Sequence, residues 1–220
     1  MRAVIVAGGP PGDDAFVRGQ CAGADLLIGV DGGVLVLERL DIRPHFAVGD
    51  FDTAGPKAVA RLRAAGVPTE THPAAKDATD THLALLIAVE RGATAIDALG
   101  VLGGPRYDHM LAAVFLLALP ALAPARVTLR DPLHTVTLLR PGESVALGGR
   151  PGEYVSLFAL SATTTGVTGS GLRYPLPSTF ALGDSLGVSN ELVGAEATVA
   201  IGGGLLLVTH VRLTAAQQNG

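Results

Sequence analysis

Acidic side chains recur in the first half of the chain, mostly just after apolar runs typical of β-strands. They lie in four short segments: Asp31-Gly32-Gly33, Gly49-Asp50-Phe51-Asp52-Thr53, Lys76-Asp77-Ala78-Thr79-Asp80 and Gly103-Gly104-Pro105-Arg106-Tyr107-Asp108-His109. Open parallel sheets bind ligands at the carboxyl ends of their strands. The placement of these carboxylates therefore indicates a binding site at one edge of such a sheet.

The pair Asp50 and Asp52 carries the strongest chemical signal. Two acids separated by one residue in an extended segment point the same way, which brings like charges together at an electrostatic cost. A divalent cation offsets that cost, and Mg²⁺ is commonly held by one or two carboxylates together with substrate phosphates. The pair is therefore suited to a nucleotide-bound metal. The alternative interpretation is a solvated acidic turn.

The segment Lys76–Asp80 leads into a helix that carries Leu83 and Ile87 on one face. One interpretation is structural, because Thr79 or Asp80 can cap that helix. The other is functional, since a cation beside two acids suits a site for a phosphate and a metal ion. An anion is favoured at a helix start in any case.

The two remaining segments add polar groups at further strand ends. In Asp31-Gly32-Gly33, the glycines would let a ligand approach the backbone, although Asp and Gly are also ordinary residues at a helix start. Arg106 has the planar fork that binds phosphate, and Asp108 can accept hydrogen bonds from a ligand amine. His109 more often makes a structural hydrogen bond than a catalytic one at such a position.

Several other classes of protein are disfavoured. The glycine-rich segment Ala7–Gly12 lacks both the Gly-Lys-Ser/Thr ending of a P-loop and the spacing of a dinucleotide fingerprint. Sixteen basic residues against twenty acidic ones, without a cationic run, argue against nucleic acid. The apolar stretch Leu111–Ala123 is too short for a membrane span. With one cysteine, Cys21, and no signal-peptide pattern, we expect a cytoplasmic protein.

The elements that position these residues divide at about Pro132. Before it, β-type runs alternate with helical patterns, which predicts a mostly parallel, doubly wound α/β domain over residues 1–132. The predicted strands are Val4–Ala7, Leu26–Val30, Phe46–Val48, Ile96–Leu102 and Val127–Leu129, and Tyr107–Leu119 is predicted as a largely buried helix.

After Pro132 no helical period is sustained, and short β-type runs are separated by glycine-rich turns. The predicted strands are His134–Leu139, Tyr154–Leu160, Ala197–Ile201 and Leu205–Val208. We therefore expect an all-β domain over residues 133–220, built as an antiparallel sandwich or roll.

Taken in order, the four segments resemble those of the thiamine pyrophosphokinase family. Two later segments also match: Gly171–Leu176 resembles the family's Gly-Leu-x-aromatic-x-Leu, and Gly187–Asn190 its Gly-x-Ser-Asn. Each segment is weak alone, but six in order are specific. The chain departs from the family pattern at Thr53, where serine is usual, and by the inserted Pro105. It also has Ala113 in place of a common asparagine and Tyr174 in place of tryptophan.

The resemblance implies that the first domain binds ATP and catalyses transfer of pyrophosphate to thiamine, with Mg²⁺ as the cofactor. The implied catalytic residues are Asp50, Asp52, Lys76 and Asp80, of which the three aspartates bind the metal. The ATP-binding set is Asp31, Gly32, Gly33, Asp50, Asp52, Lys76, Asp77, Asp80 and Arg106.

The same resemblance assigns thiamine to the second domain and implies a homodimer with sites between subunits. The expected thiamine-binding residues are Asp108, Tyr174, Ser189 and Asn190. A tyrosine face attracts a thiazolium cation. Two alternatives stay open: a related pyrophosphokinase acting on a hydroxymethylpterin, and a nucleotide- or thiamine-binding regulator without catalysis.

Overall fold

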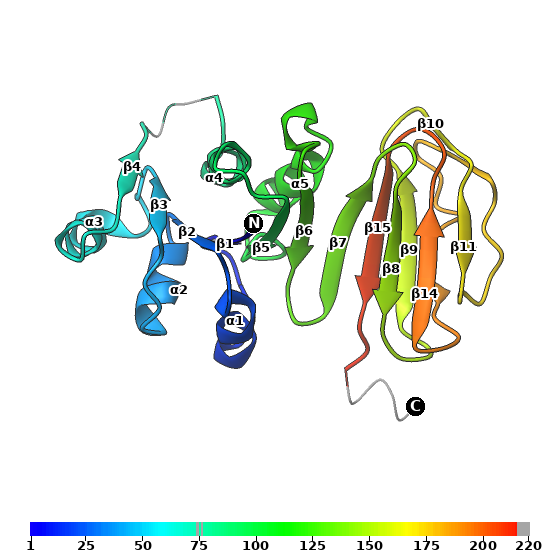
Figure 1. Ribbon diagram of the computed structural model, residues 1–220, viewed down its shortest axis with the longest axis horizontal. Coiled ribbons are helices and arrows are strands. Elements are labelled where there is room, and N and C mark those ends of the chain that lie inside the picture. Colours follow the sequence, from blue (N-terminus) through cyan, green and yellow to red (C-terminus); the bar gives the residue numbers. More distant parts are fainter. Residues whose placement is uncertain (74, 76, 215–220) are drawn as a thin grey trace. The chain divides into compact units, whose positions relative to one another are not determined.

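The computed structural model describes residues 1–73, 75 and 77–214 (Figure 1). The chain forms two compact units, Met1–Pro132 and Leu133–Gly220. In the described part of the chain, no helix has the length and apolar character needed to cross a membrane.

The first unit alternates strands and helices from its beginning. Its elements are β1 (Arg2–Val6), α1 (Asp14–Cys21), β2 (Leu26–Val30), α2 (Gly33–Arg39), β3 (Phe46–Gly49), α3 (Gly55–Ala64), β4 (Thr69–Thr71), α4 (Asp80–Glu90), β5 (Ala95–Leu99), α5 (Tyr107–Leu116), the 3₁₀ turn η1 (Pro120–Leu122) and β6 (Arg126–Arg130). The six strands pair in the order β6-β5-β1-β2-β3-β4, and every pair is parallel.

This strand order creates a switch point between β1 and β5. From β1 the chain progresses through β2, β3 and β4 on one side, then returns through α4 to place β5 on the other side of β1. Helices α1 and α2 lie on one face of the sheet, and α4 and α5 lie on the opposite face (Figure 1). Such a reversal opens a crevice at the carboxyl ends of the strands, where ligands of doubly wound folds bind.

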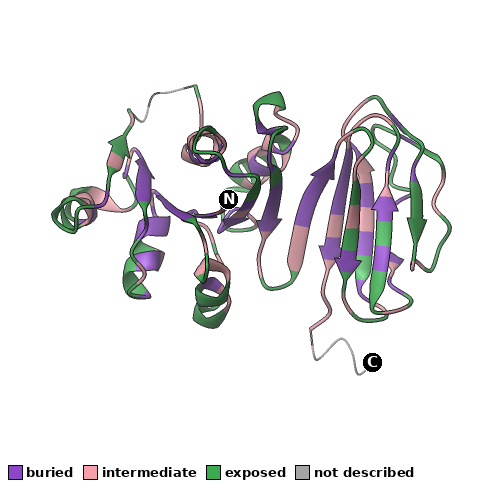
Figure 2. Ribbon diagram, viewed as in Figure 1, coloured by how far each residue is buried: buried purple, intermediate pink, exposed green. Residues whose placement is uncertain are grey.

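The central strands are buried on both faces. All residues of β2 and β3, and four of the five in β1, are buried (Figure 2). Near-continuous apolar runs such as Leu26–Val30 are what a parallel sheet covered by helices requires. The predicted doubly wound α/β architecture is confirmed.

Several boundaries, by one to three residues, and one strand differ from the sequence-based expectation; β1, for example, is Arg2–Val6 rather than Val4–Ala7. Strand β5 ends at Leu99 rather than Leu102, because Gly100 has a φ of 70° and turns the chain. Helix α5 ends at Leu116, three residues early, and the prediction that it is largely buried is wrong: only Ala113 is buried, because one face of the helix packs on the rest of the first unit while Tyr107, Leu111 and Phe115 are exposed. Strand β4 was not predicted: its sequence Thr-Glu-Thr is polar and largely exposed at the sheet edge, so it has no apolar signal.

The second unit consists of short antiparallel strands. They are β7 (His134–Leu139), β8 (Ser144–Gly148), β9 (Tyr154–Ala159), β10 (Thr163–Thr165), β11 (Thr168–Ser170), β12 (Thr179–Ala181), β13 (Asn190–Glu191), β14 (Glu196–Ala200) and β15 (Leu206–Val211). They pair as β13-β9-β15-β7, β11-β14-β8 and β10-β12.

One hydrophobic core joins two of these sheets. Leu157 of β9 and Val208 of β15 belong to the same buried cluster as Leu147 of β8 and Val199 of β14. Two sheets that bury their facing side chains against each other form a sandwich. The antiparallel β architecture predicted for the second unit is therefore confirmed.

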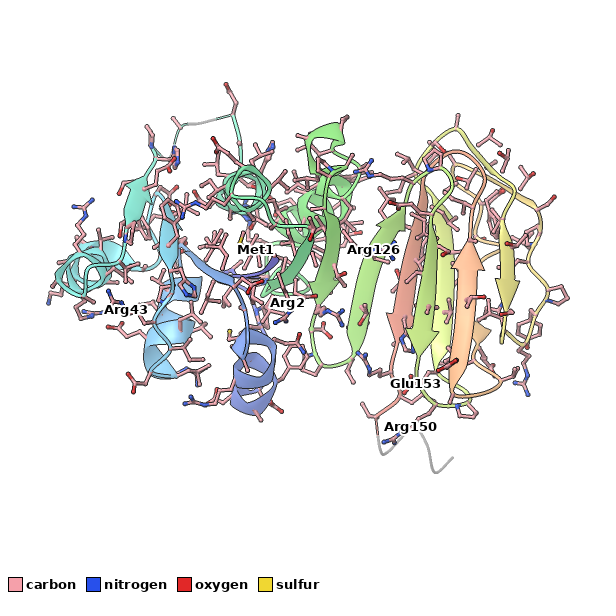
Figure 3. All side chains as sticks on the ribbon, viewed as in Figure 1. Met1, Arg2, Arg43, Arg126, Arg150 and Glu153 are labelled. Carbon is pink, nitrogen blue, oxygen red and sulfur yellow. The ribbon has the colours of Figure 1, made fainter. Side chains whose placement is uncertain are left out.

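A buried ionisable pair lies within this β unit. The His210 ring Nε2 is 2.8 Å from Glu153 Oε2, and the side chains are only 3% and 5% exposed. Glu153 lies in the turn that leads into β9 (Figure 3). Burial lowers the pKa of His210 below its usual 6.5, and the hydrogen bond and charge of Glu153 partly oppose that shift. The folded protein therefore binds this proton more weakly than the unfolded chain.

This pair predicts acid sensitivity of the fold. The His210 contribution is present above pH 6.5 and is lost as the pH falls from 6.5 toward the lowered folded pKa, at up to about 1.4 kcal/mol per pH unit for one proton. The variant His210→Gln keeps an N–H donor for Glu153 but does not titrate. We expect its free energy of unfolding, measured in urea, to vary less between pH 7.5 and pH 5. Equal pH slopes for the two proteins would contradict this.

Candidate active site

A pocket of about 620 Å³ lies at the carboxyl ends of the parallel strands in the first unit. It is formed by the segments after β1, β2, β3, β4 and β5, together with the start of α4 and one side of α5. The described residues that line it are Ala7, Gly8, Gly9, Val30, Asp31, Asp50, Asp52, Thr53, Asp77, Ala78, Thr79, Asp80, Thr81, Gly100, Val101, Gly103, Gly104, Pro105, Arg106, His109, Met110 and Ala113. All four acidic segments identified in the sequence therefore contribute to one pocket.

Glycines allow these strand ends to approach each other closely. The Gly9 N–H donates to the Gly100 carbonyl at 3.0 Å, and a Cβ at Gly9 would lie 2.5 Å from that oxygen. A Cβ at Gly33 would lie only 1.9 Å from the Val6 carbonyl oxygen. Gly32 and Gly33 are expected from the sequence to let a ligand approach the backbone. In the structure, the β1 backbone approaches Gly33, and the Thr53 side chain and the Gly8 backbone approach Gly32. Neither glycine is among the described residues that line the pocket.

Three carboxylates converge in the pocket. Asp31, Asp50 and Asp52 each offer an oxygen within 4.8 Å of the other two. Asp31 follows β2 with a φ of 41°, and Asp50 follows β3. The buried ring of Phe51, whose φ is 57°, anchors the turn between the two acids of the second segment. Three like charges so close favour a cation, and hard oxygen ligands suit Mg²⁺.

Asp31 also organises the neighbouring loop. Its Oδ1 accepts the backbone N–H groups of Thr53 at 3.3 Å and Ala54 at 3.2 Å, just before α3 begins. These two bonds join the end of β2 to the loop after β3. Asp31 therefore has a positioning role beside the charge that it brings to the cluster.

The segment before α4 has a structural and a site role together. Thr79 is the N-cap of α4, and its hydroxyl accepts the His82 N–H at 3.2 Å. Asp77, Thr79 and Asp80 all line the pocket. Within the described residues, the compact carboxylate group consists of Asp50, Asp52 and Asp31 and does not include Asp80. Metal binding by Asp80 stays a prediction, and Lys76 lies outside the described residues.

Arg106 lines the pocket while paired with a neighbour. Its guanidinium donates two hydrogen bonds to Asp108, at 2.9 and 2.7 Å, and both side chains are exposed. These bonds hold the pKa of Asp108 at about 2. A bidentate carboxylate occupies the geometry that a phosphate would take, so Arg106 can exchange one anion for the other. Asp108 is not among the described lining residues, and its predicted ligand contact is untested.

The remaining predicted residues lie in the second unit. Tyr174 is 54% exposed, and Ser189 is exposed with a φ of 59°. Asn190 is buried, and its amide bonds to the backbone of Tyr174. The structure thus brings Tyr174 and Asn190 together, while thiamine binding by these residues stays a prediction.

Sequence reasoning missed part of the pocket wall. Gly8 and Gly9 line it, as do Val101 and Met110. The glycine pair matches no phosphate-binding motif, but its position directly after β1 is a signal that it lies at the same sheet edge. Val101 and Met110 carry no signal beyond their nearness to the fourth segment.

Comparisons with known proteins identify the family. Residues 19–129 match the family model described as "Thiamin pyrophosphokinase, catalytic domain", and residues 141–206 match "Thiamin pyrophosphokinase, vitamin B1 binding domain". A relative named thiamine pyrophosphokinase from Bacillus subtilis (strain 168) is 32% identical over 205 residues, covering 93% of this chain and 95% of the relative. The chain belongs to the thiamine pyrophosphokinase family.

Solved thiamine pyrophosphokinase structures share the complete fold. The structure from Bacillus subtilis has a TM-score of 0.84 at 30% identity and covers 97% of this chain and 100% of that chain. The structure from Geobacillus thermodenitrificans has a TM-score of 0.82 at 31% identity and covers 98% and 99%. The catalytic-domain match spans most of the strand ends that form the pocket, and the vitamin B1 match includes Tyr174 and Asn190.

Proposed function

We propose that this protein transfers pyrophosphate from ATP to the hydroxyl of thiamine, giving thiamine diphosphate and AMP. The observation that carries the proposal is the carboxylate cluster of Asp31, Asp50 and Asp52 in the switch-point pocket of a chain from this family. A cluster of acids would repel a polyphosphate, so it suits ATP only together with a divalent cation.

The donor set of the cluster fits Mg²⁺. Carboxylate oxygens are its preferred protein ligands, and we propose that Asp31, Asp50 and Asp52 hold it, with Asp80 on the same pocket wall. When bound, the ion supplies positive charge to the phosphate oxygens. That the reaction requires ATP and Mg²⁺ is part of this proposal.

Two cationic residues would orient the phosphates. Arg106 would leave Asp108 for a phosphate, and Lys76, with Asp77 beside it, would add a second cation. In the proposed reaction the thiamine hydroxyl oxygen bonds to the β-phosphorus, and the bond from that phosphorus to the α,β-bridging oxygen breaks. AMP leaves, and the hydroxyl proton passes to a pocket carboxylate or to water. Holding the two reactants in line is the main task of the protein.

We assign the thiamine acceptor to residues of the second unit. Its vitamin B1 binding match, residues 141–206, supports this assignment. The exposed ring of Tyr174 offers a face to the thiazolium cation, a contact worth up to about 2 kcal/mol when desolvated. Ser189 is a proposed polar contact in the same unit, and Asp108 of the first unit is the proposed partner of the aminopyrimidine ring of thiamine.

We also propose a homodimer, in the cytoplasm, whose sites draw on both subunits. The described lining of the phosphate pocket comes wholly from the first unit, while the proposed acceptor residues Tyr174 and Ser189 lie in the second. Mixed dimers of Asp50→Asn and Tyr174→Ala chains would then recover activity above the sum of the parents. If hybrids form without recovery, each site is built within one chain. The proposed cytoplasmic location is supported by the single cysteine, which suits a reducing compartment.

The deciding experiment follows AMP and acceptor diphosphate by chromatography. ATP and Mg²⁺ are supplied with thiamine, with a hydroxymethylpterin, or with no acceptor. Thiamine-dependent AMP release with an equal amount of thiamine diphosphate supports the proposal. Turnover with the pterin alone would assign the related pyrophosphokinase, and binding without turnover would assign a regulator.

The two roles of Asp31 can be separated by a pair of variants. Asp31→Asn keeps an oxygen for the N–H groups of Thr53 and Ala54 but removes the charge, whereas Asp31→Ala removes both. We expect turnover to fall about 10-fold or more in each. Only the alanine variant should also lose about 1–2 kcal/mol of unfolding free energy. Thermal unfolding and kcat measure the two effects, and equal stabilities would refute the positioning role.

A further inference from the structure

Almost all hydrogen-bonding positions of the Asn190 side chain are occupied by backbone groups. Asn190 begins β13 and is 5% exposed. Its Oδ1 accepts the N–H of Tyr174 at 3.0 Å and the N–H of Glu191 at 2.9 Å. Its Nδ2 donates to the Tyr174 carbonyl at 2.8 Å. Both acceptor positions and one of the two amide hydrogens are therefore in use.

These bonds extend a short antiparallel pairing by one step. Leu172 forms a bridge with Leu192, and the Arg173 N–H donates to the Glu191 carbonyl at 2.9 Å. At the next position along the pairing, Tyr174 meets the side-chain amide of Asn190 instead of a backbone peptide. The amide acts as a substitute peptide group, bonding to both the N–H and the C=O of Tyr174.

The fixed backbone carries an exposed ring. Tyr174 is 54% exposed, although its own N–H and C=O are both held by a buried group. Pro175 follows it and restricts its backbone to extended conformations. An aromatic residue with an ordered backbone loses less conformational entropy when a ligand stacks on its ring than one with a flexible backbone. Rigid presentation of this kind favours binding of a cationic aromatic molecule.

We infer that Asn190 is a positioning residue, whose buried amide fixes the backbone from which the Tyr174 ring meets the cationic acceptor. Asn190 was expected to be a ligand contact from the family resemblance; its hydrogen bonds assign it to the support of Tyr174 instead. The inference rests on the proposed function, because contact between Tyr174 and thiamine belongs to that proposal.

The chain has no tryptophan, so Tyr174→Trp gives a single fluorophore at this position. In the full-length protein, thiamine is titrated while tryptophan emission is followed, and time-resolved anisotropy reports how freely the indole ring moves. The same measurements are repeated with Asn190→Ala or Asn190→Asp added. Asn190→Asp keeps the two accepted hydrogen bonds and loses the one donated to the Tyr174 carbonyl.

We expect thiamine to quench the emission of Tyr174→Trp. Adding Asn190→Ala should increase the fast component of the anisotropy decay and weaken thiamine binding about 10-fold, with a smaller effect from Asn190→Asp. In chains that keep Tyr174, KM for thiamine should rise in the same order, while KM for ATP stays within about 2-fold. Circular dichroism checks the fold, and Asn190→Asp carries the test if Asn190→Ala does not fold.

Glu191→Gln is the matched control. It weakens the ion pair with Arg173, whose Nη1 lies 2.6 Å from Glu191 Oε2, but leaves every Asn190 hydrogen bond in place. It should change neither anisotropy nor thiamine affinity. Weaker thiamine binding with unchanged anisotropy in the Asn190 variants would show a direct ligand contact and overturn the inference, as would no change in either. Absence of thiamine quenching in Tyr174→Trp alone would instead refute the proposed contact of Tyr174, and the anisotropy would still decide the role of Asn190.

Discussion

Replacing either Asp50 or Asp52 by asparagine is expected to lower kcat at least about 100-fold while the fold is retained. Each change removes one charge and one hard ligand from the cluster that also contains Asp31. Metal-borne charge stabilisation is worth several kcal/mol in the transition state, and 2.7 kcal/mol corresponds to about 100-fold. Neither side chain is buried, so packing is little disturbed. Stability without metal should be unchanged or higher, because repulsion among the three carboxylates is relieved.

The measurement is kcat at saturating ATP, thiamine and Mg²⁺, with thermal unfolding of each variant in the absence of metal. Asp41→Asn is the matched control, because Asp41 is exposed outside the pocket and its φ of 52° suits asparagine. It should keep kcat within about 2-fold. Near-normal turnover of an Asp50 or Asp52 variant at saturating Mg²⁺ would remove that residue from the metal site.

The convergence of Asp31, Asp50 and Asp52 on one sheet edge could be predicted because it depends on local pattern. Asp31 and Asp50 directly follow apolar runs that can only be buried strands, and parallel strands end at one edge. The two-residue spacing then brings Asp52 to the same place. The sequence was less informative about which third acid joins the pair, because that depends on the turn at Asp31 and on its bonds to the loop after β3.

The remaining features depend on contacts between distant residues. Asn190 bonds to Tyr174, sixteen positions away, and no periodicity marks such a pair. Strands β10 to β13 have two or three residues each, too few for an alternating pattern. The segment Asp31-Gly32-Gly33 was recognised, but the sequence did not show that Gly33 faces the backbone of β1 rather than a ligand.

That contact makes Gly33→Ala the substitution with the largest expected effect on stability. Gly33 begins α2, and a methyl group there would lie 1.9 Å from the Val6 carbonyl oxygen and 2.5 Å from its carbon. Backbone atoms at the centre of a sheet cannot rotate away as a flexible side chain can. Helix α2 would have to move off β1, and Asp31 lies only two residues before that helix. We expect a loss of about 3 kcal/mol or more of unfolding free energy, at the upper end for overpacking.

Gly19→Ala is the control, and it should change the free energy of unfolding in the opposite direction. Gly19 lies within α1, is exposed, and a Cβ there would have no atom within 4 Å. Alanine in a helix interior is up to about 1 kcal/mol more favourable than glycine, so this variant should be as stable as the parent or more stable. Urea unfolding of the parent, Gly33→Ala and Gly19→Ala proteins gives the comparison.

If Gly33→Ala matched the parent in stability, α2 would have to tolerate displacement from β1. The close approach of the two elements would then not be a requirement of the fold. If instead it is destabilised but still folds at low temperature, its kcat should also fall, because a shifted α2 carries Asp31 away from the cluster with Asp50 and Asp52.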